Sequence, residues 1–168
     1  MASQIDYRSA STFPADEVFA TTVDPDFIRA RLAQIGGPGA ALVNHAAAAG
    51  GVRYTIRHGL DAKDLPSIVR GMLPNPLVIE RTESWKPLDA GGYGGETSVS
   101  IPSTPASAAG AMRLRDVTAG GSDFLVRATV TVNVPLFGGR VESIVAEQVQ
   151  NLLAAEAAFM QEWLTSRS

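Results

Sequence analysis

The sequence contains no cysteine. A chain without thiols has no disulfide, no thiolate nucleophile, no iron–sulfur cluster and no cysteine-ligated zinc. Charged residues make up only 18% of its 168 positions, and the formal net charge is -3. Because no window is densely basic, we expect neither a nucleic acid nor an anionic membrane surface as a partner.

Long hydrophobic runs are also missing. No stretch approaches the roughly 18 consecutive apolar residues of a membrane-spanning helix, so we expect no transmembrane segment. Residues 1–8 lack the charged start and apolar run of a signal peptide, and we therefore expect a cytoplasmic protein. The length is that of one ordinary domain, and we expect residues 1–168 to form it.

The first 40 residues predict one strand and two short helices. Polar and apolar residues alternate over Ile5–Ser11, which is typical of a strand. Pro14 and Pro25 are each followed by acidic residues, a pattern that favours a helix N-terminus. The second helix places apolar side chains on one face and ends in a Gly-Gly-Pro-Gly run at residues 36–39.

The middle of the chain has the two-residue period of strands. We expect strands over 42–48, 52–60, 77–85, 97–101, 111–117 and 124–134, hairpins at the glycine pairs 50–51 and 120–121, a further glycine-flanked connection at 91–95, a short helix or turn over 64–73, and a loop over 102–109. Phe124–Val134 alternates cleanly between apolar and polar residues, which indicates an antiparallel sheet with one buried face.

The last quarter predicts one long helix. Arg140–Thr165 contains no glycine or proline and carries a broad apolar stripe. At 1.5 Å per residue it would be roughly 40 Å long. Six or seven antiparallel strands are too many to lie flat, so the sheet must curl, and this helix is the element long enough to fill its concave side. The predicted fold class is α+β: a curved antiparallel sheet of six or seven strands around a long C-terminal helix, with two short helices after the first strand.

The junction before that helix resembles a known superfamily. Val132–Glu142 runs from strand through proline, apolar residues, a glycine pair and a basic residue into the helix, and it resembles the START-like (helix-grip, SRPBCC) superfamily. Arg81–Trp85 and Ile144–Gln148 are further matches, and the chain is most similar to an uncharacterised bacterial START-like family. The superfamily includes lipid carriers, plant hormone and metabolite binders and polyketide cyclase-like proteins. The resemblance implies a cavity between sheet and last helix, and it transfers no catalytic residue, cofactor or metal.

We expect the cavity walls to come from side chains that face inward from the sheet, the last helix and the 64–73 segment. The candidates are Tyr54, Ile56, His58, Met72, Ile79, Arg81, Trp85, Thr97, Val99, Met112, Leu114, Phe124, Val126, Val130, Ile144, Gln148, Val149, Leu152 and Phe159.

Two histidines are present, and their spacing is not that of metal ligands, so we expect no metal site. His58 shares a strand face with Tyr54 and Ile56 and should point inward. There we favour a hydrogen-bonded core histidine, and the alternative is a polar anchor for a ligand. We expect His45 at a strand edge or in a loop.

Five charged and amide-bearing positions lie close to the predicted core. Arg81 and Glu83 share one strand face, and because burying charge is costly we favour an exposed ion pair at the rim over a charged pair near the cavity. Gln148 and Glu156, with their neighbour Glu147, lie on or near the apolar stripe of the last helix. We favour solvated flank positions for these residues, and the alternative is that they orient a ligand.

Three functions are compatible with these features. The leading hypothesis is binding or carrying of an apolar small molecule, such as a lipid or polyketide-like compound, without a cofactor. The second is a cyclase- or dehydratase-type enzyme that uses His58, Tyr54 or Glu83 as acid and base. The third is a protein-interaction module without a ligand. The sequence leaves monomer and homodimer open.

Overall fold

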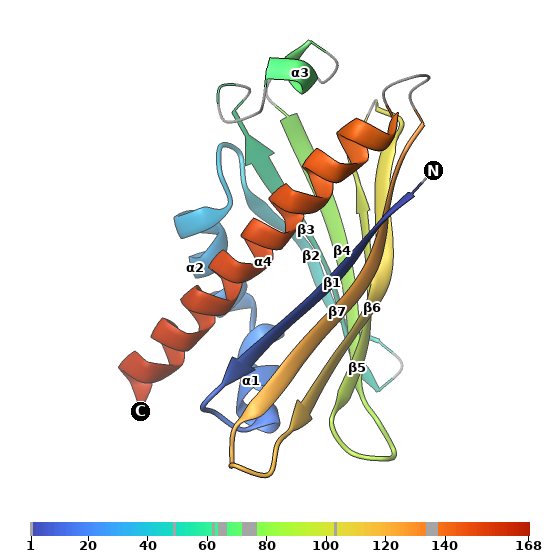
Figure 1. Ribbon diagram of the computed structural model, residues 1–168. Coiled ribbons are helices and arrows are strands. Elements are labelled where there is room, and N and C mark those ends of the chain that lie inside the picture. The colour runs from blue at the N-terminus through green and yellow to red at the C-terminus, as the bar shows by residue number, and fades with distance from the viewer. Residues whose placement is uncertain are drawn as a thin grey trace.

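The computed structural model describes residues 2–48, 50–61, 63, 67–71, 77–102, 104–133 and 138–168. Its elements, in chain order, are β1 (Ala2–Ser11), α1 (Ala15–Thr22), α2 (Pro25–Ile35), β2 (Ala41–Ala48), β3 (Gly51–Leu60), α3 (Ser67–Arg70), β4 (Leu77–Pro87), β5 (Tyr93–Ser100), β6 (Ala106–Asp116), β7 (Ser122–Val132) and α4 (Gly138–Arg167) (Figure 1). Met72, Val134 and half of the helix or turn expected over 64–73 lie outside the described residues.

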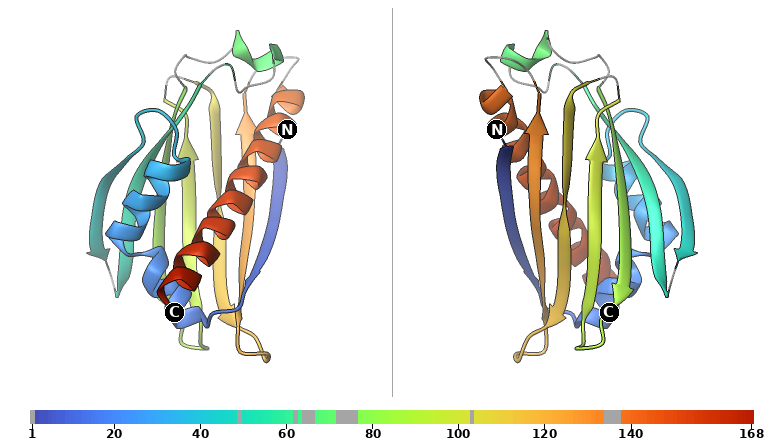
Figure 2. Two further views of the ribbon diagram at one scale, coloured as in Figure 1. Left: turned by 90° about the vertical axis from the view of Figure 1, so that its left-hand side faces the viewer. Right: turned by 90° about the vertical axis from the view of Figure 1, so that its right-hand side faces the viewer.

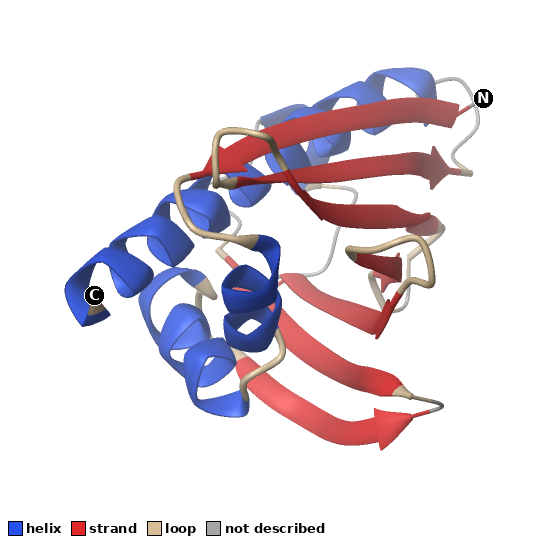
Figure 3. Ribbon diagram, turned by 90° about the horizontal axis from the view of Figure 1, so that it is seen from below, coloured by secondary structure: helices blue, strands red, loops and turns tan. Residues whose placement is uncertain are grey.

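The seven strands form one antiparallel sheet in the order β1-β7-β6-β5-β4-β3-β2. The sheet curves, and α4 crosses its concave side diagonally while α1 and α2 lie at one end of the same side (Figures 2 and 3). The prediction of a curved sheet around a long C-terminal helix, with two short helices after the first strand, is confirmed. No helix among the described residues is long and apolar enough to cross a membrane.

Helix α2 begins and packs as its sequence predicts. The Asp24 side chain accepts a hydrogen bond from the Asp26 backbone N–H at 2.9 Å, which satisfies one of the free N–H groups at the helix start. The buried ring of Phe27 lies 5.6 Å from the Phe159 ring and 5.3 Å, edge-on, from the Trp163 ring. These aromatic contacts hold α2 against the C-terminal half of α4.

The N-terminal half of α4 is tied to the sheet by Glu142. This buried carboxylate accepts a hydrogen bond from the Val132 backbone N–H at 2.9 Å, at the point where β7 ends. A charged acceptor satisfied by a buried backbone donor is a strong contact. Glu142 therefore fixes where the helix leaves the sheet and how it crosses the concave face.

Two sequence predictions about strand limits are wrong. Residues 106–109, expected in a loop, form the start of β6 and pair with both β5 and β7. Their side chains are only Ala and Ser, so the apolar alternation that marks a strand is weak there. Gly94 and Gly95, expected at a connection, lie inside β5. The backbone of β4 and the ring of Trp85 approach Gly95 too closely for a Cβ, which explains a glycine within that strand.

Candidate functional site

An apolar space lies between α4 and the upper ends of β3 and β4, and we call it the upper cavity. It has a volume of about 310 Å³. Aliphatic side chains make most of its wall: Ile35, Gly36, His58, Gly59, Leu60, Leu77, Ile79, Ile101, Ile144, Val145, Gln148, Val149, Asn151 and Leu152. The polar groups His58, Gln148 and Asn151 are therefore exceptions in an apolar space.

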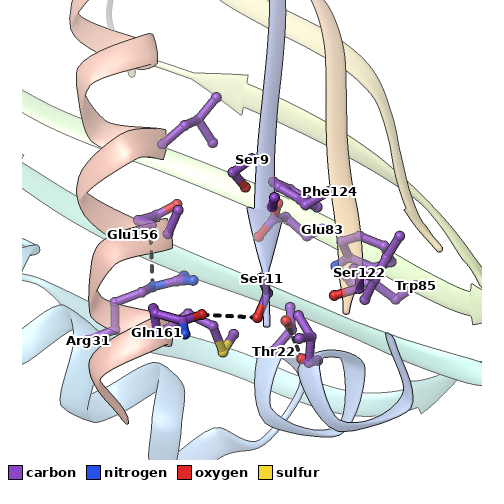
Figure 4. A pocket seen from close by; sticks show the side chains of 16 residues that line it. Ser9, Ser11, Thr22, Arg31, Glu83, Trp85, Ser122, Phe124, Glu156 and Gln161 are labelled. Carbon is purple, nitrogen blue, oxygen red and sulfur yellow. Dashed lines mark hydrogen bonds and ion pairs between the residues drawn. The ribbon is translucent and has the colours of Figure 1, made fainter. Parts of the chain in front are cut away.

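A second space, the lower cavity, lies near the C-terminal half of α4 and the helices α1 and α2 (Figure 4). Its volume is about 90 Å³, and its wall is more polar: Ser9, Ala10, Ser11, Val18, Thr22, Arg31, Glu83, Trp85, Leu114, Ser122, Phe124, Leu153, Glu156, Ala157, Met160 and Gln161. A middle cavity of about 40 Å³ is lined by Ile5, Arg81, Glu83, Thr97, Val99, Ala108, Ala109, Met112, Val126, Ala128, Val149 and Leu153.

The inward face of β4 passes all three cavities. Leu77 and Ile79 line the upper cavity, Arg81 the middle one, Glu83 the middle and lower ones, and Trp85 the lower one. This order follows from the two-residue period of a strand, which places alternate side chains on one face. Facing it, Val149 of α4 is shared by the upper and middle cavities. The spaces therefore follow one another along the groove between β4 and α4.

Four buried charged residues, Arg31, Arg81, Glu83 and Glu156, form what we call the ionic cluster. An oxygen of Glu156 lies 2.7 Å from Arg81 Nη2 and 3.4 Å from Arg31 Nε. Arg81 Nε lies 3.7 Å from Glu83 Oε1. The cluster joins α2, β4 and α4, and its two cations and two anions balance. Balance of this kind is required because an unpaired charge in the interior is strongly unfavourable.

The electrostatics of the cluster favour its charged form. Burial alone would raise the pKa of Glu156, but the nearby Arg31 and Arg81 guanidinium groups outweigh it and lower the pKa to about 2. Burial likewise opposes the charge of Arg81, and Glu156 and Glu83 reverse this and raise the Arg81 pKa. The Arg81–Glu156 pair thus stays ionised across the ordinary pH range.

Tyr54 and Glu83 make a buried contact next to the cluster. The Tyr54 hydroxyl donates to Glu83 Oε1 at 3.0 Å. Burial, and then the negative charge of Glu83, raise the pKa of Tyr54 well above its ordinary value. Tyr54 therefore keeps its proton at neutral pH and acts as a fixed hydrogen-bond donor.

His58 is buried in the wall of the upper cavity, and its Nε2 has no hydrogen-bond partner among the described residues. Burial, and then the charge of Arg81, lower the pKa of His58 to about 3. The imidazole is therefore neutral near pH 7, and the free nitrogen can accept or donate one hydrogen bond depending on the tautomer. The hydrogen bond expected of a core histidine is not found at this nitrogen.

The predicted wall residues are distributed over the three cavities. The upper cavity has His58, Ile79, Ile144, Gln148, Val149 and Leu152, the middle one Arg81, Thr97, Val99, Met112 and Val126, and the lower one Trp85, Leu114 and Phe124. Four more candidates pack in or against the core and line none of these spaces: Tyr54, Ile56, Val130 and Phe159. Met72 lies outside the described residues.

The favoured interpretations of three charged residues are wrong. Arg81 and Glu83 are buried and do not form an exposed rim pair, and Glu156 is buried and not a solvated flank residue. All three are tolerated inside because they pair with one another and with Arg31. The predicted solvated position is found for Glu147, which is exposed, whereas its neighbour Gln148 is half-buried at the upper cavity.

His45 lies on the edge strand β2, as predicted, and its Nε2 contacts the Val23 carbonyl at 2.6 Å.

Sequence reasoning missed Arg31. It follows Phe27 by four residues and lies between Ile28 and Leu32 on the buried side of α2. A cation within an apolar helical stripe was the available signal, because such a residue must find a buried partner. The partner, Glu156, lies on the last helix, far away in the sequence, so no local pattern connects the two.

The comparisons with known proteins assign the chain to a family. The family described as "Protein of unknown function (DUF2505)" matches residues 6–164. The chain belongs to the DUF2505 family. This DUF2505 chain is 25% identical over 157 residues to the uncharacterized protein Rv0481c of Mycobacterium tuberculosis, and the match covers 90% of each chain.

Solved structures place DUF2505 among START-like folds. The protein TTHA0849 of Thermus thermophilus matches with a TM-score of 0.63 at 14% identity, over 99% of both chains. The Zhui aromatase/cyclase of Streptomyces sp. R1128 matches with a TM-score of 0.63 at 11% identity, over 99% of this chain and 96% of the other. At these identities the likeness establishes the fold alone, and the predicted helix-grip architecture is confirmed.

Proposed function

We propose that this protein binds or carries an apolar small molecule, such as a lipid or polyketide-like compound, in the upper cavity. One observation carries the proposal: a space of about 310 Å³ with aliphatic walls holds a single buried histidine nitrogen that has no partner among the described residues. Ligand pockets usually have volumes of about 300–1,000 Å³, mostly apolar walls and a few placed polar groups. The upper cavity has these properties at the small end of that range.

The chemistry of the wall indicates what a ligand should look like. Ile79, Ile144 and Leu152 offer only apolar contact, so most of the ligand should be hydrocarbon. A neutral His58 next to that surface suits one hydroxyl or carbonyl group, since it offers one hydrogen bond and no charge. Burying its free nitrogen without a partner costs about 1–3 kcal/mol, and a ligand hydrogen bond would recover part of this.

An acid–base enzyme is supported less well. Of the three residues considered for this role, His58 lines the upper cavity and Glu83 the middle and lower ones, and Glu83 accepts a hydrogen bond from Tyr54 and pairs with Arg81. The pKa of Tyr54 is raised and that of His58 is lowered to about 3, so neither side chain gains or loses a proton near pH 7. A general acid or base works best with a pKa near the working pH.

An interaction module without a ligand has little support in the described residues. Val43, on the edge strand β2, is the one large hydrophobic side chain among them that is exposed. Docking sites between proteins usually present a contiguous apolar patch of several hundred Å². A single exposed valine does not provide such a surface.

The proposal is tested by titrating the purified chain with 1-aminoanthracene, a neutral apolar fluorophore. We expect saturable fluorescence enhancement at one site and competition by 1-octanol. Extraction of freshly purified protein followed by mass spectrometry should yield an apolar compound in stoichiometric amount. Absence of saturable binding in a folded, ligand-stripped sample would contradict the proposal.

A matched pair of variants on α4 locates the site. Gln148→Phe fills space in the upper cavity, whereas Glu147→Phe adds the same ring at an exposed neighbour. We expect the first variant to weaken fluorophore binding at least tenfold and the second to leave it unchanged. Thermal unfolding of both proteins confirms that they are folded. Equal affinities would place the fluorophore elsewhere.

A further inference from the structure

The lower cavity contains N–H donors that have no acceptor. The Nη2 atom of Arg31 and the indole Nε1 of Trp85 are buried and have no hydrogen-bond partner among the described residues, and both side chains line this space, whereas Arg31 Nε faces the Glu156 carboxylate at 3.4 Å. The two residues are 5% and 3% exposed. Their side chains enter the cavity from α2 and from β4, two elements that are far apart in the sequence (Figure 4). Buried donors are normally paired, so these two groups require an explanation.

Four hydroxyl- and amide-bearing side chains of the lower cavity, Ser11, Thr22, Ser122 and Gln161, donate hydrogen bonds within the protein. Ser11 Oγ donates to Gln161 Oε1 at 3.0 Å, and Gln161 Nε2 donates to Thr12 Oγ1 at 2.8 Å. Ser122 Oγ donates to the Phe13 carbonyl at 2.8 Å, and Thr22 Oγ1 to the Val18 carbonyl at 2.7 Å. These contacts hold the wall in place. The buried donors of the wall that have no partner among the described residues are Arg31 Nη2 and Trp85 Nε1, so a group that binds them must bring an acceptor atom.

The charges around the lower cavity determine which acceptor fits. Glu83 and Glu156 also line it, and Arg31 and Arg81 balance them. A ligand carboxylate would meet two carboxylates of the same sign and leave a net negative charge in the interior. A neutral carbonyl oxygen accepts the same N–H groups without changing the balance. Phe124, Leu114 and Met160 supply apolar contact around it.

We infer that the lower cavity is a second binding site, which takes the neutral carbonyl group of a small apolar ketone, ester or amide through Trp85 Nε1–H. Its volume of about 90 Å³ is that of about three water molecules, which is enough for a carbonyl group and the carbons next to it. The site uses other residues than the upper cavity and does not rest on the function proposed there.

Nuclear magnetic resonance tests this site directly, because the chain has two tryptophans and so two indole N–H signals. The uniformly ¹⁵N-labelled full chain is titrated with acetophenone and, for comparison, with ethylbenzene, benzoate and benzylamine. We expect acetophenone to shift the Trp85 indole proton saturably downfield and to bind at least fivefold tighter than the other three compounds. The Trp163 signal should not move with it.

Tighter binding of benzoate or benzylamine would overturn the inference in favour of an ionic site. If ethylbenzene binds as tightly as acetophenone, the cavity does not recognise the carbonyl group and the inference is wrong. If no compound shifts the Trp85 indole signal saturably, the cavity binds none of these ligands and the inference is also wrong.

Substitutions that remove single donors complete the test. Trp85→Phe keeps an aromatic ring and loses the N–H, and we expect it to weaken acetophenone binding about threefold to tenfold, the usual effect of one hydrogen bond. Trp163→Phe, in a residue outside the cavity wall, should leave the affinity unchanged. If Trp85→Phe is folded and binds acetophenone as the parent does, the indole has no part in the site and the inference is wrong. Because Trp85 lines the lower cavity and not the upper one, its indole signal distinguishes failure of this inference from failure of the upper-cavity proposal.

Discussion

Arg81 of β4 and Glu156 of α4 form an ion pair inside the protein, with Nη2 and Oε2 2.7 Å apart and side chains 8% and 10% exposed. The pair connects the middle of the sheet to the helix that crosses it. It lies where the middle and lower cavities meet, since Arg81 lines one and Glu156 the other. The same contact therefore holds the helix in place and separates the interior spaces.

The first prediction concerns this pair. Arg81→Met leaves Glu83 and Glu156 with Arg31 as their remaining cation, and we expect it to lower the free energy of unfolding by about 3–5 kcal/mol. Glu156→Met should have a comparable effect. The double variant retains the balanced charges of Arg31 and Glu83, so its loss should be smaller than the sum by more than about 1 kcal/mol. Urea denaturation of the four proteins measures this coupling.

An exposed ion pair provides the control. Arg127 Nε lies 2.8 Å from Asp6 Oδ1, but the two side chains are 81% and 68% exposed. Because solvent screens such pairs, Arg127→Met should leave the denaturation midpoint nearly unchanged. Strictly additive losses for Arg81 and Glu156 would show that the two residues act independently, contrary to their geometry.

The second prediction concerns pH and His58. Its pKa is about 3 in the folded protein and about 6.5 when unfolded, so between these values only the unfolded chain binds the proton. Stability should therefore fall as pH decreases from 6.5 to 3, by at most about 1.4 kcal/mol per pH unit from this residue. Glu156, whose folded pKa is about 2, adds a further loss below about pH 4.5.

His58→Leu separates the two contributions. It removes a group that favours the unfolded state in acid, so the stability of the variant should depend less on pH between about 6.5 and about 4.5. Above about pH 7 the two profiles should run parallel, since a neutral histidine binds no proton in either state. Parallel profiles over the whole range, measured by denaturation at each pH, would mean that His58 titrates normally and is not buried as described.

The third prediction concerns Tyr54. Tyr54→Phe removes the 3.0 Å hydrogen bond to Glu83 and leaves a buried carboxylate with one donor fewer, which should cost about 1–3 kcal/mol of stability. Tyr93→Phe removes a comparable bond to Asp16 at an exposed position and should cost much less. The hydrogen bond to Asp16 raises the pKa of Tyr93 to about 12, so spectrophotometric titration of the Tyr54→Phe protein should show one tyrosine fewer that ionises well above pH 10, with Tyr93 remaining.

The sequence predicts the architecture because each element carries its own local signal. Alternation marks β3 and β7, proline and acidic residues mark the helix starts, and an unbroken apolar stripe marks α4. The alternation of apolar and polar side chains did not reveal the strand over residues 106–109, because alanine and serine differ little in hydrophobicity. Both neighbouring strands nevertheless pair with this segment.

The candidate site was less predictable because its charged residues depend on distant partners. The local pattern placed Arg81 and Glu83 on one strand face but could not show that this face is buried or that Arg31 and Glu156 meet them there. Because the sequence does not show these partners, the free-energy cost of burying a charge favoured exposed positions for Arg81 and Glu83. In the structure the partners are present and make burial of both charges possible. The sequence also predicted one cavity, whereas the described residues line the upper, middle and lower cavities.

The most direct test of the proposed function is to observe a ligand inside the upper cavity. Perdeuterated protein with protonated isoleucine and leucine methyl groups is mixed with 1-octanol, and intermolecular nuclear Overhauser effects are recorded. We predict contacts from the alkyl chain to the methyl groups of Ile79, Ile144 and Leu152, which line that space. A folded protein that gives no contact to any of these methyl groups at saturating 1-octanol would contradict the account.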